Sequence, residues 1–418
     1  MNTSWRPQGN SIDSASAGGL LEHIRRRQGA ATRAEMARLT GVARSTIAQR
    51  IDQLIDAGLV VEGGDAPSTG GRRGTTLSLC ASAGVVLAAD LGVTHCRWSI
   101  ADLAGTPLLA QTRDIDIADG PLVVLDQLIQ DFDASLTQLG FTAADVCGVG
   151  VGVPGPVEVD TGRAVNPPIM PGWNEFSVTD YLRRHYDAPA YLDNDVNIMA
   201  IGEYAMHFAD EVDDFLLIKV GSGIGSGIIA GRQLQRGGKG AAGDLGHVPV
   251  GRAADVPCRC GNSGCVEAVA GGAAILRQLR ELGHEAVTVR DAATMVSAGH
   301  SDANRLVRQA GRDLGEVVAT TVNILNPSLI VLSGALADAG DELYAGVREV
   351  VYRRSTVLAT RHLRIVHGRL GADAGIVGAT ELVLSEVLSA KAVDAALAAG
   401  TSPVGRARQD RNEVPGVP

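Results

Sequence analysis

The chain has 418 residues, a length that exceeds one compact core and indicates two or three domains. Hydrophobic residues make up 45% and charged residues 20%, which excludes a chain that is disordered over most of its length. The net charge of −10 excludes a nucleic-acid-binding protein that is basic throughout, but not a small basic module on an acidic body. Residues 1–80 carry ten arginines against seven acidic residues, so the N-terminal part is the candidate for such a module.

The ends of the chain and its cysteines indicate the compartment. Residues 1–18 and 391–418 are rich in polar or small residues without periodicity, so we expect two disordered tails. The first 19 residues lack the apolar stretch of a signal peptide, and no apolar run reaches the ~18–20 residues of a membrane span. Six cysteines in a chain of this length do not form a disulfide framework. We therefore expect a cytoplasmic protein with no membrane partner.

Residues 19–80 have the pattern of a winged helix-turn-helix DNA-binding domain. The segment from Thr32 to Glu35 has the spacing of a capping box and opens a helix. A second helix follows, whose apolar stripe at helical period consists of Ile47, Ile51, Leu54 and Ile55. Two short strands over 59–61 and 76–79 flank a Gly-rich loop, which would be the wing.

The polar face of the second helix carries cationic and hydrogen-bonding side chains, which suit phosphates and base edges. We expect the DNA contacts to come from Arg44, Ser45, Thr46, Gln49 and Arg50 on this helix and from Arg72 and Arg73 in the wing. Ala43, at the expected start of the helix, has no capping side chain. The alternative is a three-helix protein-interaction module with ordinary surface arginines.

From Val85 onward, apolar strands alternate with helical stretches, which is typical of an α/β fold. The expected strands are 85–89, 146–153, 215–220 and 329–332, and the expected helices are 122–139, 303–325 and 374–388.

Two glycine-containing stretches follow predicted strands and have the composition of phosphate-binding loops. Asp90 can hold Mg²⁺ through water, Gly92 allows a phosphate close to the backbone, and Thr94 offers a hydroxyl. The second stretch has glycine at alternate positions, at Gly221, Gly223, Gly225 and Gly227. The alternatives are an ordinary Asp-x-Gly turn for the first and a glycine hairpin between two strands for the second.

Three thiols lie within eight residues, at Cys258, Cys260 and Cys265, and His247 lies eleven residues before the first of them. Three thiolates and an imidazole favour Zn²⁺, and four protein ligands indicate a structural site. The alternative is three free thiols that are close by chance. The remaining cysteines stand in apolar surroundings and are expected to be buried: Cys80, Cys96 and Cys147.

Polar residues follow another predicted strand, at Asn194 and Asp195, and precede a helix. Asp195 could take a proton from a substrate hydroxyl, and Asn194 could hydrogen-bond to a sugar, although capping of the helix is the more common local role. Asp244 and Glu267 flank the cysteine loop, and zinc ligation through one nitrogen of His247 would leave the other nitrogen free for a ligand.

In this order, the motifs resemble those of the ROK family of repressors, open reading frames and sugar kinases. The resemblance covers about residues 19–390 and is most specific from Gly243 to His247 and in the cysteine loop up to Glu267. It implies an α/β, two-lobed, actin-like (ribonuclease H-like, sugar-kinase) fold with a cleft, preceded by a winged helix as in the family's repressors. The implied lobes are 81–192 together with 367–390 for the N-terminal lobe, and 193–366, with the zinc loop, for the C-terminal lobe.

The resemblance also implies roles for individual residues. The zinc ligands would be His247, Cys258, Cys260 and Cys265, and the sugar pocket would be lined by Asn194, Asp195, Asp244, His247 and Glu267. Asp195 would be the base of a kinase, and the phosphates would face Asp90, Gly92, Thr94, Gly221, Gly223 and Gly225. The chain departs from the family in carrying Asp244 where Glu is usual, and Ser333 and Ala335 in a loop that is usually richer in glycine.

The sequence therefore predicts a sugar-responsive transcriptional regulator, most simply a repressor of carbohydrate-metabolism genes. It would bind operator DNA as a homodimer or dimer of dimers, with a sugar or sugar phosphate as effector and a structural Zn²⁺. The alternative is an ATP-dependent, glucokinase-like sugar kinase that uses Mg²⁺ and has Asp195 as general base. A third possibility is a protein-interaction scaffold on an inactive kinase fold.

Overall fold

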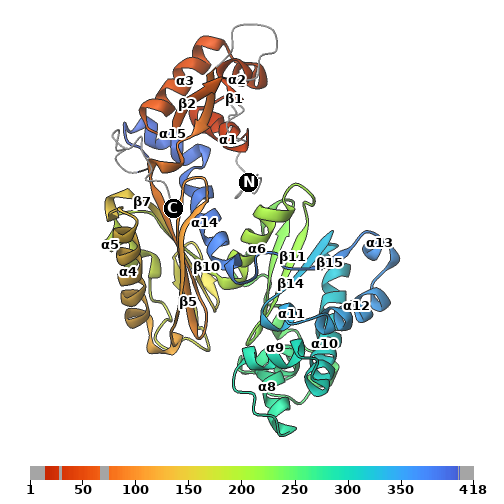
Figure 1. Cartoon of the computed structure of the whole chain (residues 1–418). Coiled ribbons are helices and arrows are strands. Elements are labelled where there is room, and N and C mark those ends of the chain that lie inside the picture. The colour runs from red at the N-terminus through yellow and green to blue at the C-terminus, as the bar shows by residue number, and fades with distance from the viewer. Residues whose placement is uncertain (1–14, 28–30, 66–74, 403, 405–418) are drawn as a thin grey trace.

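The computed structural model describes residues 15–27, 31–65, 75–402 and 404, and all structural statements concern these residues. An N-terminal module lies at one end of the molecule and is seated on the first of two α/β lobes (Figure 1). The second lobe lies beside the first and extends to the opposite end, where helices α8 and α9 are found. Within the described part of the chain, no helix has the length and apolar character needed to cross a membrane.

The N-terminal module contains three helices and a three-stranded antiparallel sheet with the order β1-β3-β2. Its elements are α1 (Ala17–Arg27), β1 (Ala31–Thr32), α2 (Arg33–Thr40), α3 (Arg44–Asp56), β2 (Val60–Asp65) and β3 (Thr75–Leu79). The hydroxyl of Thr32 accepts a hydrogen bond of 3.2 Å from the backbone N–H of Glu35, which begins α2 at the position expected from the sequence. Helix α3 begins without a side-chain cap at Ala43, as its sequence predicts.

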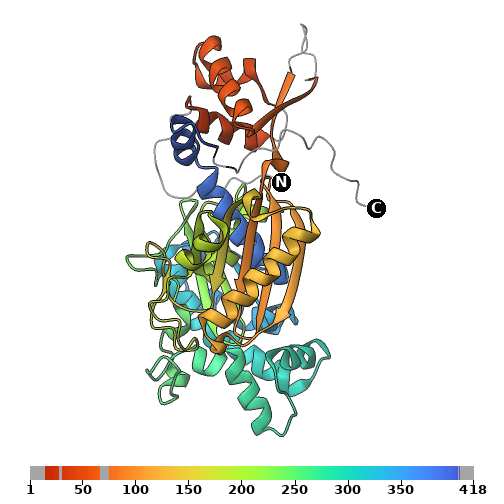
Figure 2. The same cartoon turned by 90° about the vertical axis from the view of Figure 1, so that its left-hand side faces the viewer.

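The first lobe contains a five-stranded sheet with the order β10-β7-β4-β5-β6. Its strands are β4 (Val85–Leu91), β5 (His95–Asp102), β6 (Pro107–Asp114), β7 (Val146–Val153) and β10 (Ala190–Asn194). The central pairs β4–β7 and β7–β10 are parallel, and β5 and β6 continue the sheet in antiparallel pairing. Helices α4 (Pro121–Gln138) and α5 (Val178–Tyr186) cover its outer face (Figure 2), and α14 (Ala374–Val387) covers the other. A short pair, β8 (Val157–Glu158) and β9 (Arg163–Ala164), precedes α5.

The second lobe contains a sheet with the order β13-β12-β11-β14-β15. Its strands are β11 (Phe215–Val220), β12 (Ile224–Ala230), β13 (Gln233–Leu234), β14 (Leu329–Ser333) and β15 (Arg364–His367). Its helices are α7 (Glu267–Ala270), α8 (Gly272–Glu281), α9 (Val289–Ser297), α10 (Ser301–Leu325), α11 (Ala335–Asp338), α12 (Glu342–Arg354) and α13 (Val357–Thr360). Helix α6 (Asp195–Glu203) joins the lobes and packs on both α14 and β12.

Glycine permits the close packing of the helices between the lobes. A Cβ atom at Gly378 of α14 would lie 1.6 Å from the carbonyl oxygen of Ile198 in α6, and one at Gly227 of β12 would lie 2.5 Å from the Cβ of Ala200. Either side chain would force the elements apart. Helix α6 is therefore held between the first lobe and the second sheet at a fixed distance from both.

The expectation of disordered tails is wrong for the parts that the structure describes. Helix α1 begins at Ala17, and α15 (Ala390–Ala398) follows α14. The Ser389 hydroxyl caps α15, and the backbone N–H of Gly18 donates a 2.8 Å hydrogen bond to Asp394. Alanine is the strongest helix former, and the contact with α1 buries Val393, so this alanine-rich segment is ordered by packing. Residues 1–14 and 405–418 of the expected tails lie outside the described residues.

One hydrophobic cluster extends from the N-terminal module into the first lobe. It contains Leu20, Leu21 and Ile24 of α1, Ile47, Ile51 and Leu54 of α3, Val383, Leu384 and Val387 of α14, and Val393 of α15. All of these side chains are buried. The module therefore shares its core with the lobe and is not attached by a flexible linker alone.

Candidate functional site

The three cysteines of the loop and His247 come together in the second lobe. One ligand atom from each of the four side chains lies within 4.8 Å of all the others. The His247 Nδ1 atom lies 3.6 Å from the Cys258 Sγ atom, and the Cys260 and Cys265 sulfurs are 3.7 Å apart. Around a tetrahedral Zn²⁺ with ordinary bond lengths, these separations are about 3.6 and about 3.8 Å. The donor set and its spacing therefore fit zinc.

The metal loop orients two residues that the sequence assigned to a sugar pocket. The Nδ1 atom of His247 faces the cysteines, while its Nε2 atom lies 3.7 Å from an oxygen of Asp244. This geometry fits the prediction that one nitrogen of His247 binds the metal while the other nitrogen faces a ligand. Glu267, two residues after Cys265, begins α7, and its carboxylate accepts a 2.9 Å hydrogen bond from the backbone N–H of Ile224.

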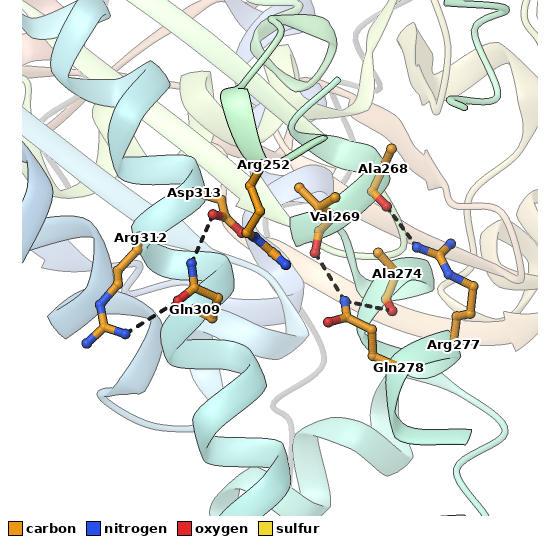
Figure 3. Close-up of polar contacts among 9 residues, drawn as sticks. All are labelled: Arg252, Ala268, Val269, Ala274, Arg277, Gln278, Gln309, Arg312 and Asp313. Atoms are coloured by element: carbon orange, nitrogen blue, oxygen red, sulfur yellow. Dashed lines mark hydrogen bonds and ion pairs between the residues drawn. The ribbon is translucent and has the colours of Figure 1, made fainter. Parts of the chain in front are cut away.

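A second anchor fixes the same loop away from the cysteines (Figure 3). Arg252, between His247 and Cys258 in the sequence, donates a 2.8 Å hydrogen bond to the buried carboxylate of Asp313 on α10. Gln309 donates to the other oxygen of Asp313 at 3.0 Å, so both oxygens have a partner. On α8, Gln278 donates to the carbonyl of Val269 and Arg277 to that of Ala268, both in α7. These contacts hold α7, and with it Glu267, against α8.

Asn194 caps helix α6 at the end of β10. Its Oδ1 atom accepts a 2.9 Å hydrogen bond from the backbone N–H of Val196, and its Nδ2 atom donates to the carbonyl of Gly155 at 3.0 Å. The capping role considered for this residue is therefore confirmed. Next to it, the fully buried Asp193 accepts hydrogen bonds from Asn197 and from Arg236, at 2.8 Å each.

Asp195 forms an ion pair that the sequence did not reveal. The Lys219 Nζ atom lies 2.6 Å from the Asp195 Oδ2 atom. Desolvation by itself would lower the pKa of Lys219, but the nearby carboxylates of Asp195 and Asp90 hold that pKa above its usual value. A lysine in the otherwise apolar strand Phe215–Val220 was the available signal, because such a lysine needs a buried partner.

Asp90, the next-to-last residue of strand β4, lies near this pair and is itself buried. Burial raises the pKa of Asp90 to about 6, and the Lys219 ammonium opposes that rise. The Oδ1 atom of Asp90 is buried without a hydrogen-bond partner among the described residues. Two carboxylates and one ammonium therefore lie close together here, with one buried acceptor available to a further cation or donor.

The glycines that were expected to face phosphates lie in turns or at positions of close packing. Gly92 lies in the hairpin between β4 and β5, against the His95 imidazole, and Thr94 is exposed. Residues 221–223 form the turn between β11 and β12, so the hairpin considered for this stretch is confirmed. A Cβ atom at Gly223 would lie 2.4 Å from a Glu267 oxygen, and Gly225 packs on Val196. Close packing accounts for these glycines, and their contact with phosphate stays a prediction.

The polar face of α3 is only partly as expected. Arg44, Ser45 and Gln49 are exposed, whereas Thr46 and Arg50 are half-buried. Within the described residues, Arg44 has no acidic partner; Arg33, by contrast, pairs with Asp52 and Glu62 at 2.7 and 2.8 Å. The charge on Arg44 is therefore available to an anion. Arg72 and Arg73 lie outside the described residues.

The remaining cysteines differ in burial. Cys96 and Cys147 are buried, and burial raises the pKa of each thiol to about 12. Cys80 is half-buried, so the expectation that it is buried is wrong; it directly precedes the short helical turn at 81–83.

Comparison with known proteins assigns the chain to a family. The sequence model described as the ROK family matches residues 86–386, which is most of the chain. The protein belongs to the ROK family. The matched segment comprises both lobes and excludes the N-terminal module.

Relatives within the ROK family include regulators and enzymes. A xylose repressor from Caldicellulosiruptor bescii is 29% identical over 371 residues, which is 86% of this chain and 92% of that protein. A glucokinase from Halalkalibacterium halodurans is 31% identical over 313 residues, which is 70% of this chain and 93% of the enzyme. The crystal structure of a ROK family transcriptional regulator, a homologue of the E. coli MLC protein, superposes with a TM-score of 0.78. It covers 91% of this chain and 97% of its own at 24% identity, which shows a common fold.

The coverage separates the two classes of ROK relatives. The repressor matches 86% of this chain and the glucokinase 70%, although each is itself covered by more than nine-tenths. This chain therefore contains residues that have no counterpart in the glucokinase. Its length agrees better with that of the repressor.

Proposed function

We propose that the protein is a sugar-responsive, DNA-binding transcriptional repressor of genes for carbohydrate metabolism. The observation that carries the proposal is the N-terminal module, which presents a polar face on α3 and shares its hydrophobic core with a ROK lobe. The matches to a xylose repressor over most of both chains support the same function. Because the module shares its core with the first lobe, a movement of the lobes would also move the module. A DNA-binding domain attached by a flexible linker would not follow such a movement.

The N-terminal module would be a winged helix-turn-helix in which α3 enters the major groove. Arg44, Ser45 and Gln49 would contact phosphates and base edges, with Thr46 and Arg50 at the margin of the interface. The wing would carry the expected contacts of Arg72 and Arg73.

The test of DNA binding is a salt titration of operator affinity on the full chain. Arg44→Ala should weaken binding about fivefold to tenfold and lower the salt slope by about one, because one phosphate contact is lost. Arg184→Ala, an exposed arginine of α5 on the first lobe, is the matched control and should change neither. An Arg44→Ala variant that binds operator as the wild type does would contradict the role of α3.

The effector would be a sugar or sugar phosphate bound between the lobes. Asn194, Asp195, Asp244, His247 and Glu267 would line this pocket, and a structural Zn²⁺ on His247 and the three cysteines would hold the last two in place. When bound, zinc supplies a rigid crosslink of the loop. Titration with xylose, glucose, N-acetylglucosamine and their phosphates should show one sugar that binds and changes operator affinity. If no sugar in the panel shifts the operator affinity, the effector part of the proposal is lost.

The repressor would act as a homodimer or a dimer of dimers. Three exposed apolar side chains lie on α10 and α13: Ile324 is 75% exposed, Val357 84% and Leu358 82%. Helices α10 and α13 are in contact, and in the proposed dimer a second copy would cover these side chains. Sedimentation velocity of the wild type and of Val357→Asp measures whether this surface holds two copies together.

The second candidate function is an ATP-dependent sugar kinase, because Asp195 and Asp90 lie near each other and near Lys219. The Lys219 ion pair opposes it, since the ammonium binds one of the two carboxylate oxygens of Asp195. Of the two residues that depart from the glycine-rich pattern of the family, Ser333 is buried and Ala335 is exposed. An ADP-release assay with common hexoses should show no turnover above that of Asp195→Asn. Turnover that this substitution abolishes would establish the kinase.

A further inference from the structure

A second group of metal-ligating side chains lies between the end of α8 and the start of α10; α8 is found at the end of the molecule opposite the N-terminal module (Figure 1). His284 follows α8, His300 precedes α10, and Asp302 lies in the first turn of α10. One nitrogen of each imidazole and one oxygen of the carboxylate all lie within 4.8 Å of one another. Neither the resemblance to ROK proteins nor the cleft accounts for this group.

The two histidines occupy equivalent positions at two helix ends. Each follows a glycine in the left-handed region, Gly283 with φ 87° after α8 and Gly299 with φ 78° after α9. The backbone N–H of His284 donates to the carbonyl of Leu279 at 3.0 Å, and that of His300 to Met295 at 2.9 Å. In both cases the bond spans five residues, as in a Schellman motif. The same local geometry therefore directs both imidazoles, and the packing of α8, α9 and α10 brings them together.

The contacts of the group occupy both oxygens of Asp302 and one nitrogen of His284, and they leave a nitrogen of His300 available. The His284 Nε2 atom lies 3.0 Å from the Asp302 Oδ2 atom, and the other oxygen of Asp302 accepts from Arg305 at 3.1 Å. The rings of His284 and His300 meet edge to face, with centroids 4.6 Å apart. The Nδ1 atom of His300 is buried and has no hydrogen-bond partner in the part of the chain that the structure describes. A buried ring nitrogen without a partner is uncommon unless a proton donor or a cation completes it.

We propose that His284, His300 and Asp302 bind one divalent transition-metal ion, for which Zn²⁺ is the probe. Two imidazoles and a carboxylate are ligands that zinc, nickel and cobalt share, and three protein ligands leave positions for water. The ligand atoms of a tetrahedral zinc site lie about 3.3 Å apart, so the widest separation must close by up to about 1.5 Å. Rotation of an imidazole about χ2 covers this distance without moving the helices. The bound ion would crosslink the end of α8 to the start of α10.

The absence of sulfur distinguishes this site from the cysteine loop in the experiment. The full chain, purified with its cysteine-loop metal in place, is titrated with Zn²⁺ by calorimetry and the bound metal is counted by mass spectrometry. The wild type should take up one further equivalent, and His284→Ala/His300→Ala should take up none. His362→Ala, a histidine of the same lobe outside both groups, is the matched control and should bind as the wild type does.

Cobalt gives a spectroscopic separation of the two sites. Co²⁺ bound at the histidines should show weak d–d bands without thiolate charge transfer, and these bands should survive Cys260→Ser and vanish in Asp302→Asn. Asp302→Asn also serves if the double variant does not fold, because it keeps the shape of the side chain. An equal metal count in the wild type and in the folded Asp302→Asn or double variant would overturn the proposal, as would a wild type that takes up no further ion.

Discussion

The two ends of helix α14 lie in different environments. At its start, Gly375 packs on the carboxylate of Asp90 beside the Asp195–Lys219 ion pair, so closely that a Cβ atom would lie 2.1 Å from an Asp90 oxygen. In its second half, Val383, Leu384 and Val387 belong to the hydrophobic cluster that also contains α1 and α3 of the N-terminal module. One helix thus contacts both α6, which begins with Asp195 of the proposed effector site, and the hydrophobic cluster of the proposed DNA-binding module.

The difference between the two ends shows how a signal could pass along α14. The cleft end contacts a titratable carboxylate whose environment changes when a cation or ligand binds. The module end is embedded in close-packed apolar side chains, which move together and do not deform gradually. A small displacement of α14 at its polar end would therefore move the apolar end, and the module packed on it, as a rigid body.

The largest expected effect comes from the module end. Leu384→Ala removes a buried side chain from the shared cluster and should lower the free energy of unfolding by about 2–5 kcal/mol. Because the cleft is untouched, sugar affinity should persist while the sugar-induced change in operator affinity falls. Urea unfolding, sugar titration and operator binding measure the three quantities. A full operator response to sugar in Leu384→Ala would show that the shared cluster does not transmit the signal.

The next effect concerns a buried charge at the module end. Burial raises the pKa of Glu381 on α14 to about 7, and Arg25 of α1 opposes the rise. Between its ordinary value of 4.5 and about 7, the folded chain keeps a proton that the unfolded chain has released. The stability of the wild type should therefore fall by about 3 kcal/mol as the pH rises through this interval.

Glu381→Gln removes the titrating carboxyl group. The unfolding free energy should then depend less on pH between about 5 and 7. Asp90→Asn is the matched variant at the cleft end, where the folded pKa is about 6 and the loss should be complete at lower pH. Urea unfolding at several pH values, with and without sugar, measures both. Sugar should alter the Asp90 interval and leave that of Glu381 in place; the reverse pattern would contradict the assignment of the two ends.

A smaller effect is expected from the cleft end itself. Gly375→Ala places a methyl group against the Asp90 side chain, which should cost about 1–3 kcal/mol of stability and displace the start of α14. Operator affinity without sugar should then shift toward the sugar-bound value. Gly238→Ala, where nothing lies within 4 Å of the added Cβ, is the control and should leave both quantities unchanged. Equal operator affinities of Gly375→Ala and the wild type would remove α14 from the mechanism.

Much of the molecule was predictable because its signals are local. The strands at 146–153 and 215–220 have the predicted bounds, since continuous apolar runs between turns are typical of buried strands. The gathering of the three cysteines was predictable because they are neighbours in the sequence, and the geometry of such a donor set depends on few other residues. The expected start of α2 and the missing cap of α3 also depend on only a few adjacent side chains.

Other features were missed because they depend on residues far apart in the chain. Helix α15 was taken for a tail since only its contact with α1, more than 370 residues away, buries Val393. Lys219 gave no indication of Asp195 as its partner, because β11 and the start of α6 meet only in the fold. Arg50 was placed on the exposed face by helical periodicity, although its neighbours bury half of it.

The sequence by itself determined the elements, the family resemblance and the donor atoms of the cysteine loop, because periodicity, capping and ligand spacing act over short stretches of chain. Only the tertiary structure decided which ionisable side chains are buried away from solvent. It buries Asp90 and Glu381 at opposite ends of one helix and brings His284 and His300 together, because desolvation and proximity depend on the packing of distant segments.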